Sequence, residues 1–128
     1  MLDTDWLVDV IAGRPNATRI IDELHPSPLY VSIISHGELF EGVFDFPDTD
    51  ARIDELYAFL NRYETLPLSG PIMENFGRTR SELRRSGNLI SDLDLLIGAT
   101  AVSHDLVLLT RNTRHFARIP DLRLYESE

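Results

Sequence analysis

Residues Ser91–Asn112 have the sequence SDLDLLIGATAVSHDLVLLTRN, a helical pattern followed directly by a strand pattern. The predicted helix begins at Ser91, carries acidic residues in its first turn and runs to Ser103. Leu106–Thr110 is a short, continuous apolar run, which is typical of a strand buried on both faces. A helix that leads into a fully buried strand indicates one unit of an α/β fold with a parallel sheet.

The rest of the chain repeats this alternation. Leu2-Asp3-Thr4 is expected to end a very short first strand, and the other strand candidates are Leu29–Ile33, Tyr63–Leu66 and Leu122–Tyr125. Five further helices are expected: one with Asp5 as its N-cap, one through Ile20–Leu24, one that contains the helical spacing of Ile53, Leu56 and Leu60, and others at Ser35–Phe44 and 70–85. Strands that alternate with helices predict an α/β fold in which helices cover both faces of a mainly parallel sheet. A length of 128 residues, without repeats or linkers, suits a single domain over 1–128.

Composition excludes several classes of protein. The chain has no Cys, which rules out disulfides, thiolate metal sites and a cysteine nucleophile. The acidic start Met1–Asp5 does not match the basic region of a signal peptide, and no apolar run approaches the roughly 20 residues that span a bilayer. We therefore expect a cytoplasmic protein without a membrane partner. No P-loop, G-x-S-x-G or G-x-G-x-x-G motif is present, which disfavours NTPase, serine hydrolase and dinucleotide-binding functions.

The candidate site consists of polar residues at the predicted strand ends. Asp3 ends the first strand, Glu38 lies in the helix after the second, Asp92 and Asp94 open the helix before the fourth, and Asn112 follows the fourth. In an open parallel sheet, ligands bind outside the carboxyl ends of the strands, so these residues are expected to converge there. Clustered carboxylates repel one another unless a cation lies among them. Oxygen ligands without Cys or paired His favour Mg²⁺ or Mn²⁺, which would support phosphodiester hydrolysis.

Helix capping is an alternative role for each of these residues. Ser35-x-x-Glu38 matches a capping box, and Ser91-x-x-Asp94 is an acidic variant of it. Asp92 could favour a helix N-terminus through the macrodipole, and Asp3 and Asp5 could be turn or cap residues. Capping does not explain why acids occur at three different strand ends with Asn112 at a fourth. The four His residues show no metal-ligand spacing.

Four segments, in this order and spacing, resemble the PIN-domain VapC toxins. They are Leu2-Asp3-Thr4-Asp5, Ser32-x-x-Ser35-x-x-Glu38-Leu39, Asp92-x-Asp94-Leu95-Leu96-Ile97-Gly98-Ala99-Thr100-Ala101, and Leu109-Thr110-Arg111-Asn112-x-x-His115-Phe116. The resemblance implies a three-layer α/β/α PIN-like domain with a central, mainly parallel sheet of four or five strands. It also implies a Mg²⁺- or Mn²⁺-dependent endoribonuclease that cuts structured RNA, often tRNA.

The resemblance assigns roles to the candidate residues. Asp3, Glu38 and Asp94 match the catalytic acids and metal ligands, Asp92 matches an acid found in many members, and Asn112 stands at a fourth position that is often Asp. The Thr110–Phe116 ending is most similar to members that cut initiator tRNA. Gly98 stands where the family usually has Ala, which is expected to be tolerated.

The resemblance further implies a homodimer and a cognate VapB-like antitoxin that inhibits the enzyme by laying a helix into a groove beside the site. Candidate groove residues lie on two helices around Pro47, and about half of them are expected to be core: Leu39, Phe40, Val43, Phe44, Ile53, Leu56, Tyr57 and Leu60.

Two other functions fit parts of the pattern. A phosphorelay receiver domain also gathers acids around Mg²⁺, but its chemistry needs a Lys and this chain has none. A PIN scaffold that only binds RNA or protein would not need Asp3, Glu38 and Asp94 together, and metal-dependent cleavage distinguishes it from the enzyme.

A net charge of −9 is unusual for a protein that binds nucleic acid. Residues 1–66 contain 4 Arg and 13 acids, whereas residues 67–128 contain 8 Arg and 8 acids. Arg78, Arg85, Arg111 and Arg114 are therefore the candidates for RNA phosphate contacts. Alternatively, Arg78 pairs with Glu74 or Glu82 along its own helix.

Overall fold

A narrow parallel sheet crosses the centre of the structure, a computed structural model that describes residues 1–126. β1 (Tyr30–Ser32) pairs with β2 (Glu64–Leu66), and β3 (Val107–Leu108) pairs with β4 (Arg123–Leu124), both in parallel. Leu2 connects the two pairs, because it bridges to Val31 on one side and to Leu109 on the other. The order across the sheet is therefore β2, β1, the Leu2 segment, β3 and β4. The predicted parallel sheet is confirmed, with the N-terminal segment at its centre.

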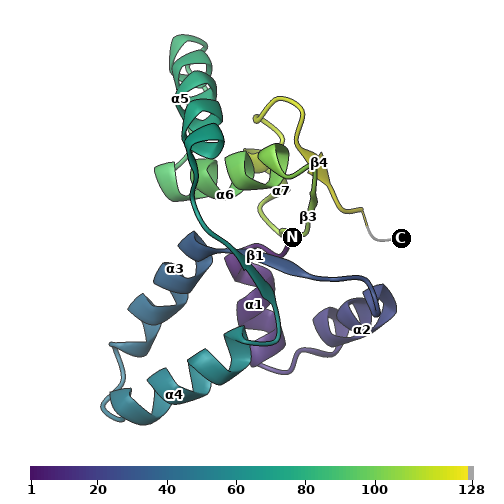
Figure 1. The fold of residues 1–128 in the computed structure, drawn as a ribbon, viewed down its shortest axis with the longest axis vertical. Coiled ribbons are helices and arrows are strands. Elements are labelled where there is room, and N and C mark those ends of the chain that lie inside the picture. The colour runs from purple at the N-terminus through teal and green to yellow at the C-terminus, as the bar shows by residue number, and fades with distance from the viewer. Residues whose placement is uncertain (127–128) are drawn as a thin grey trace.

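Helices cover both faces of this sheet (Figure 1). They are α1 (Thr4–Ile11), α2 (Pro15–Leu24), α3 (Ile33–Val43), α4 (Thr49–Leu60), α5 (Gly70–Arg85), α6 (Asp92–Ser103) and α7 (Thr113–Phe116). Figure 1 shows α1 to α4 on one side of the sheet and α5 to α7 on the other. None of the helices within residues 1–126 combines the length and the apolar character needed to cross a bilayer.

Neighbouring residues of the central segments point into two separate cores. Leu2 and Leu109 pack into the core beneath α1 to α4, which includes Leu7 of α1. Leu108, one residue away from Leu109, packs into the core beneath α5 to α7 with Phe116. This alternation is what a strand with side chains on both faces requires. The three-layer α/β/α arrangement implied by the resemblance is confirmed.

Two predicted helix starts were too late. α1 begins at Thr4 because Asp3, and not Asp5, is its N-cap: Asp3 Oδ1 accepts the Thr4 N–H at 2.8 Å. α3 begins at Ile33 because the hydroxyl of Ser32 accepts the Ile34 N–H at 3.0 Å. Ser35 therefore lies inside the helix, and the predicted Ser35–Glu38 capping box is wrong. The same early start shortens β1 at its carboxyl end, since Ile33 belongs to the helix and not to the strand.

Candidate active site

Asp3 lies at the centre of the candidate site, where the middle segment of the sheet turns into α1. Its side chain is buried and accepts the Thr4 N–H on Oδ1 and the Thr110 hydroxyl on Oδ2, at 2.8 and 2.7 Å. Burial raises the pKa of Asp3 to about 7, and the negative charges of Asp5 and Asp94 act in the same direction. The hydrogen bonds from Thr110 and Thr4 lower that pKa and only partly compensate. Asp3 is thus a carboxyl group whose charged form is disfavoured in the protein alone.

Glu38 joins Asp3 through Thr4. The Thr4 hydroxyl donates to Glu38 Oε1 at 2.7 Å and lies 2.9 Å from the hydroxyl of Ser35, which is fully buried. Because Thr4 also gives its backbone N–H to Asp3, one residue holds two of the predicted acids. Ser35 and Glu38, three residues apart on α3, therefore both face α1.

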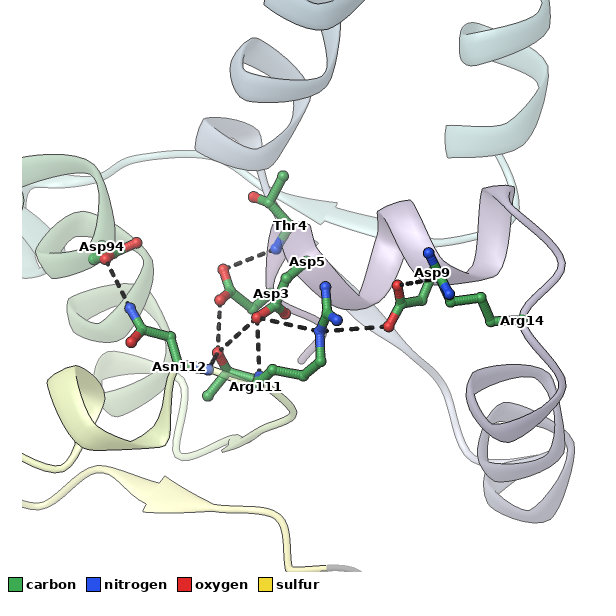
Figure 2. Close-up of polar contacts among 9 residues, drawn as sticks. Asp3, Thr4, Asp5, Asp9, Arg14, Asp94, Arg111 and Asn112 are labelled. Atoms are coloured by element: carbon green, nitrogen blue, oxygen red, sulfur yellow. Dashed lines mark hydrogen bonds and ion pairs between the residues drawn. The ribbon is translucent and has the colours of Figure 1, made fainter.

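Asp94 and Asn112 form the other side of the site. Asn112 Nδ2 donates to Asp94 Oδ2 at 3.3 Å, and the Asn112 backbone N–H donates to the Thr110 hydroxyl at 3.0 Å. The Thr110 hydroxyl in turn binds Asp3, so the contacts form one continuous path from Asp94 to Asp3 (Figure 2). The strand ends therefore converge as the sequence predicted.

Asp92 does not belong to this network. Its side chain is 61% exposed, and its Oδ1 pairs with Arg80 Nε of α5 at 2.9 Å. The hydroxyl of Ser91 accepts the Asp94 N–H at 3.2 Å, which confirms the cap predicted for α6. Asp92 is thus an exposed acid in the first turn of α6, where its negative charge interacts favourably with the positive end of the helix dipole.

A second polar cluster adjoins the site and was not predicted. Asp5 and Asp9, one turn apart on α1, both face Arg111 (Figure 2). Asp5 Oδ2 accepts the Arg111 backbone N–H at 2.9 Å, and Arg111 Nε lies 3.4 Å from Asp9 Oδ2. Arg14 Nε lies 3.1 Å from the other oxygen of Asp9. The only signal in the sequence was the spacing of four between Asp5 and Asp9, which is common in solvated helices and does not point to a partner 106 residues away.

The donor set of the site fits a hard divalent cation. Within residues 1–126 no three His, Asp or Glu side chains lie close enough together to enclose a metal ion. Mg²⁺ does not need such an enclosure, because it retains several waters and binds through one or two carboxylates. A cation beside Asp3 would offset the burial and the repulsion that raise the pKa of this residue.

The sequence profile of the PIN domain family matches residues 1–122. The chain belongs to the PIN domain family.

Relatives with known names support this membership. Ribonuclease VapC1 of Haemophilus influenzae is 30% identical over 96% of this chain and 93% of its own length. The tRNA(fMet)-specific endonuclease VapC of Salmonella typhimurium is 31% identical over 97% of this chain and 94% of its own length. In the crystal structure of DNA-bound VapBC from Salmonella typhimurium, a chain that is 30% identical aligns with a TM-score of 0.88, covering 98% of this chain and 95% of that one. A chain of VapBC2 from Rickettsia felis, bound to a promoter DNA fragment, is 31% identical, with a TM-score of 0.87 and coverage of 98% and 96%.

This PIN domain also has an apolar groove of about 600 Å³ between α1, α3 and α4. The groove was predicted from two helices, and Leu39, Val43 and Leu56 do line it. Leu39, Leu56 and Leu60 are buried in the core, so the expectation that some of these residues pack internally is confirmed, whereas Phe44 and Tyr57 are exposed. Residues of α1 and its C-cap complete the groove, and no local pattern pointed to them because α1 ends at Ile11 and α3 begins only at Ile33: Val8, Val10, Ile11 and Ala12.

The arginines of residues 67–128, the part of the chain in which positive and negative charges balance, differ in whether they form ion pairs. Within residues 1–126, Arg78, Arg85 and Arg114 are exposed and form no ion pair, so the alternative pairing of Arg78 with Glu74 or Glu82 is absent there. Arg111, in contrast, faces the carboxylates of Asp5 and Asp9.

Proposed function

We propose that this PIN domain is a divalent-metal-dependent endoribonuclease that hydrolyses phosphodiester bonds of structured RNA, with tRNA as the substrate class. The observation that carries the proposal is the continuous path of hydrogen bonds from Asp94 through Asn112 and Thr110 to the buried Asp3. Two relatives, named as a ribonuclease and as a tRNA(fMet)-specific endonuclease, support the substrate class.

Asp3, Glu38 and Asp94 are the proposed acids of a Mg²⁺ or Mn²⁺ site, and each would hold the ion either directly or through one of the waters that such an ion retains. When bound, the ion supplies an activated water and neutralises charge that develops on the scissile phosphate. Thr110 orients Asp3, and Thr4 orients Glu38. The side-chain amide of Asn112 donates to Asp94 Oδ2 and thereby holds the orientation of the Asp94 carboxylate. Asp92 would have to release Arg80 before it could reach an ion, so we assign it to the helix terminus and not to the ligand set.

We further propose that the protein is the toxin of a type II toxin–antitoxin pair and that a VapB-like antitoxin helix occupies the groove between α1, α3 and α4. The apolar lining of this groove and the VapBC complexes of similar proteins support this assignment. An enzyme that cuts tRNA would act in the cytoplasm. The homodimer implied by the sequence resemblance stays a prediction.

The test of this function is cleavage of an initiator tRNA transcript by the purified protein in Mg²⁺ or Mn²⁺, with and without EDTA. Glu38→Gln and Asp94→Asn should each lower the cleavage rate at least about 100-fold, because each removes a ligand charge. Glu41→Gln is a matched control, since Glu41 is an exposed acid on the same helix as Glu38.

Three outcomes would contradict the proposal. Full cleavage in excess EDTA would exclude metal-dependent hydrolysis. Near wild-type rates in both site variants would show that the acids are assigned wrongly. RNA binding without cleavage under every metal condition would identify the protein as a binding scaffold.

A further inference from the structure

We infer that Asp5 is a positioning residue, which acts with Asp9 to hold Arg111 and thereby fixes the turn that presents Thr110 and Asn112 to the site. This inference rests on the proposed function, because it assigns a role in RNA cleavage to residues outside the ligand set. Its structural part, the attachment of the turn to α1, can be tested without any activity.

Arg111, in the turn after β3, contacts α1 through both its backbone and its side chain. Asp5 Oδ2 accepts the Arg111 backbone N–H at 2.9 Å and lies 3.5 Å from the Thr110 hydroxyl. Arg111 Nε lies 4.0 Å from Asp5 Oδ2 and 3.4 Å from Asp9 Oδ2. Two carboxylates of one helix therefore bind both the backbone and the guanidinium of Arg111.

The neighbours of Arg111 on both sides belong to the candidate active site. Thr110 donates its hydroxyl to Asp3, and Asn112 donates its side-chain amide to Asp94 (Figure 2). A shift of the Arg111 backbone would displace both groups together, because they flank it in the chain. Displacements of about 1 Å in a site of this kind can cost up to about 100-fold in rate.

The charges of this cluster favour positioning over contact with RNA phosphate. Arg111 and Arg14 together face Asp5 and Asp9, so two positive charges meet two negative ones. The positive charge of Arg111 is thus offset within the protein, unlike that of the exposed Arg85. Asp5 Oδ1 is buried and has no hydrogen-bond partner within residues 1–126. An unsatisfied buried oxygen costs stability, and such costs are typical of residues that support functional sites.

The kinetic test is single-turnover cleavage of the initiator tRNA transcript over a range of enzyme concentrations, which separates the maximal rate from the half-saturating concentration. Asp5→Ala should lower the maximal rate about tenfold and change half-saturation by less than about twofold. Asp5→Asn should recover most of the rate, because its amide oxygen can still accept the Arg111 N–H. Asp22→Ala is the matched control with an unchanged rate, since Asp22 is an exposed acid on α2, outside the cluster of Asp5, Asp9 and Arg111.

Arg111→Ala separates positioning from phosphate binding. It should lower the maximal rate by less than Asp5→Ala, because the backbone N–H remains, and it should leave the salt dependence of half-saturation unchanged. A loss of about one unit in the log–log salt slope would show that Arg111 contacts phosphate and would overturn its assignment. A wild-type maximal rate in Asp5→Ala would overturn the role of Asp5.

Hydrogen exchange of backbone amides tests the same inference when no activity is measured. In Asp5→Ala, the amides of Arg111 and Asn112 should exchange at least about tenfold faster, whereas Asp22→Ala should leave them unchanged. If the wild-type protein cleaves no RNA but this exchange pattern holds, the proposed function fails and the attachment of the turn stands. Unchanged exchange in Asp5→Ala would overturn the inference whether or not the protein is an enzyme.

Discussion

Asp3 is placed where a negative charge would serve the proposed cation binding but is unfavourable for the folded protein alone. Burial raises its pKa from 3.8 to about 7. Between these values the folded protein holds a proton that the unfolded chain releases, so the free energy of unfolding falls as the pH rises from about 4 to 7 and stays low above this range. The same residue that supports the proposed activity is therefore a source of instability at neutral pH.

Asp3→Asn should abolish cleavage and stabilise the metal-free protein. At pH 8 the variant should exceed the wild type by roughly 1 kcal/mol or more in free energy of unfolding, and the difference should shrink toward pH 4. Urea denaturation in EDTA at several pH values measures this. Asp54→Asn, an exposed substitution on α4, serves as the control. If the free energy of unfolding of Asp3→Asn and of the wild type changed in parallel with pH, the Asp3 charge would not destabilise the folded protein.

Single residues differ in how far the sequence could predict them. Asp3, Glu38, Asp94 and Asn112 follow from strand ends that must meet at one edge of a parallel sheet. The pairing of Asp5 with Arg111 depends on which strand lies next to the Leu2 segment, and no local pattern encodes that neighbour.

At the scale of elements, the helices and strands follow from local patterns, whereas their starts and their close contacts do not. The apolar periodicity of α3 is visible in the sequence, but its first residue depends on whether Ser32 or Ser35 caps the helix. Ser35 is used for the contact with Thr4, which becomes apparent only when α1 lies beside α3. Packing against a neighbouring element likewise decides whether Gly98 can be replaced.

Gly98 of α6 lies against Ile119, and an added Cβ would collide with Ile119 Cδ1. Ala is the better helix former by about 1 kcal/mol, but overpacking of a buried side chain costs about 1–3 kcal/mol. Gly98→Ala should therefore give no gain in stability, and Gly fits this position as the sequence resemblance implied. In the wild type, Ile119→Val should cost about 1 kcal/mol, but in Gly98→Ala it should cost less or be stabilising. Additive effects in this double-mutant cycle, measured by thermal denaturation, would show that Ile119 moves aside freely.

The groove between α1, α3 and α4 is also a property of packed elements. Ile11 and Phe46 line it and are 51% and 45% exposed. Ile11→Glu should weaken neutralisation by an antitoxin at least about tenfold, because a charge replaces an apolar contact, and should leave RNA cleavage unchanged. Inhibition of cleavage by the co-expressed antitoxin measures this, with Glu55→Gln in the same groove as the matched control. Full inhibition of Ile11→Glu would place the antitoxin elsewhere.

At the scale of the whole molecule, the sheet separates two layers of different charge. α1 to α4 belong to residues 1–66, which hold 13 of the acids against 4 Arg, whereas α5 to α7 belong to the part with 8 Arg and 8 acids. The candidate site lies at the carboxyl edge of the sheet, between these layers. RNA, as a polyanion, should therefore approach the site over α5 to α7, although the protein as a whole is acidic.

This approach predicts which arginines set the salt dependence of RNA binding. Arg85→Ala and Arg114→Ala should each weaken binding of the initiator tRNA transcript and flatten the log–log salt dependence by about one unit, because each loses one phosphate contact. Arg19→Ala is the matched control: Arg19 lies on α2 in the acidic layer, paired with Glu23, and its slope should equal that of the wild type. Binding is measured in Ca²⁺, which suits oxygen ligands but supports cleavage poorly, over a series of salt concentrations. Unchanged slopes in both Arg85→Ala and Arg114→Ala would place the RNA path away from α5 and α7. A reduced slope in Arg19→Ala would place it over the acidic layer, where only a bound cation or a partner chain could offset the negative charge.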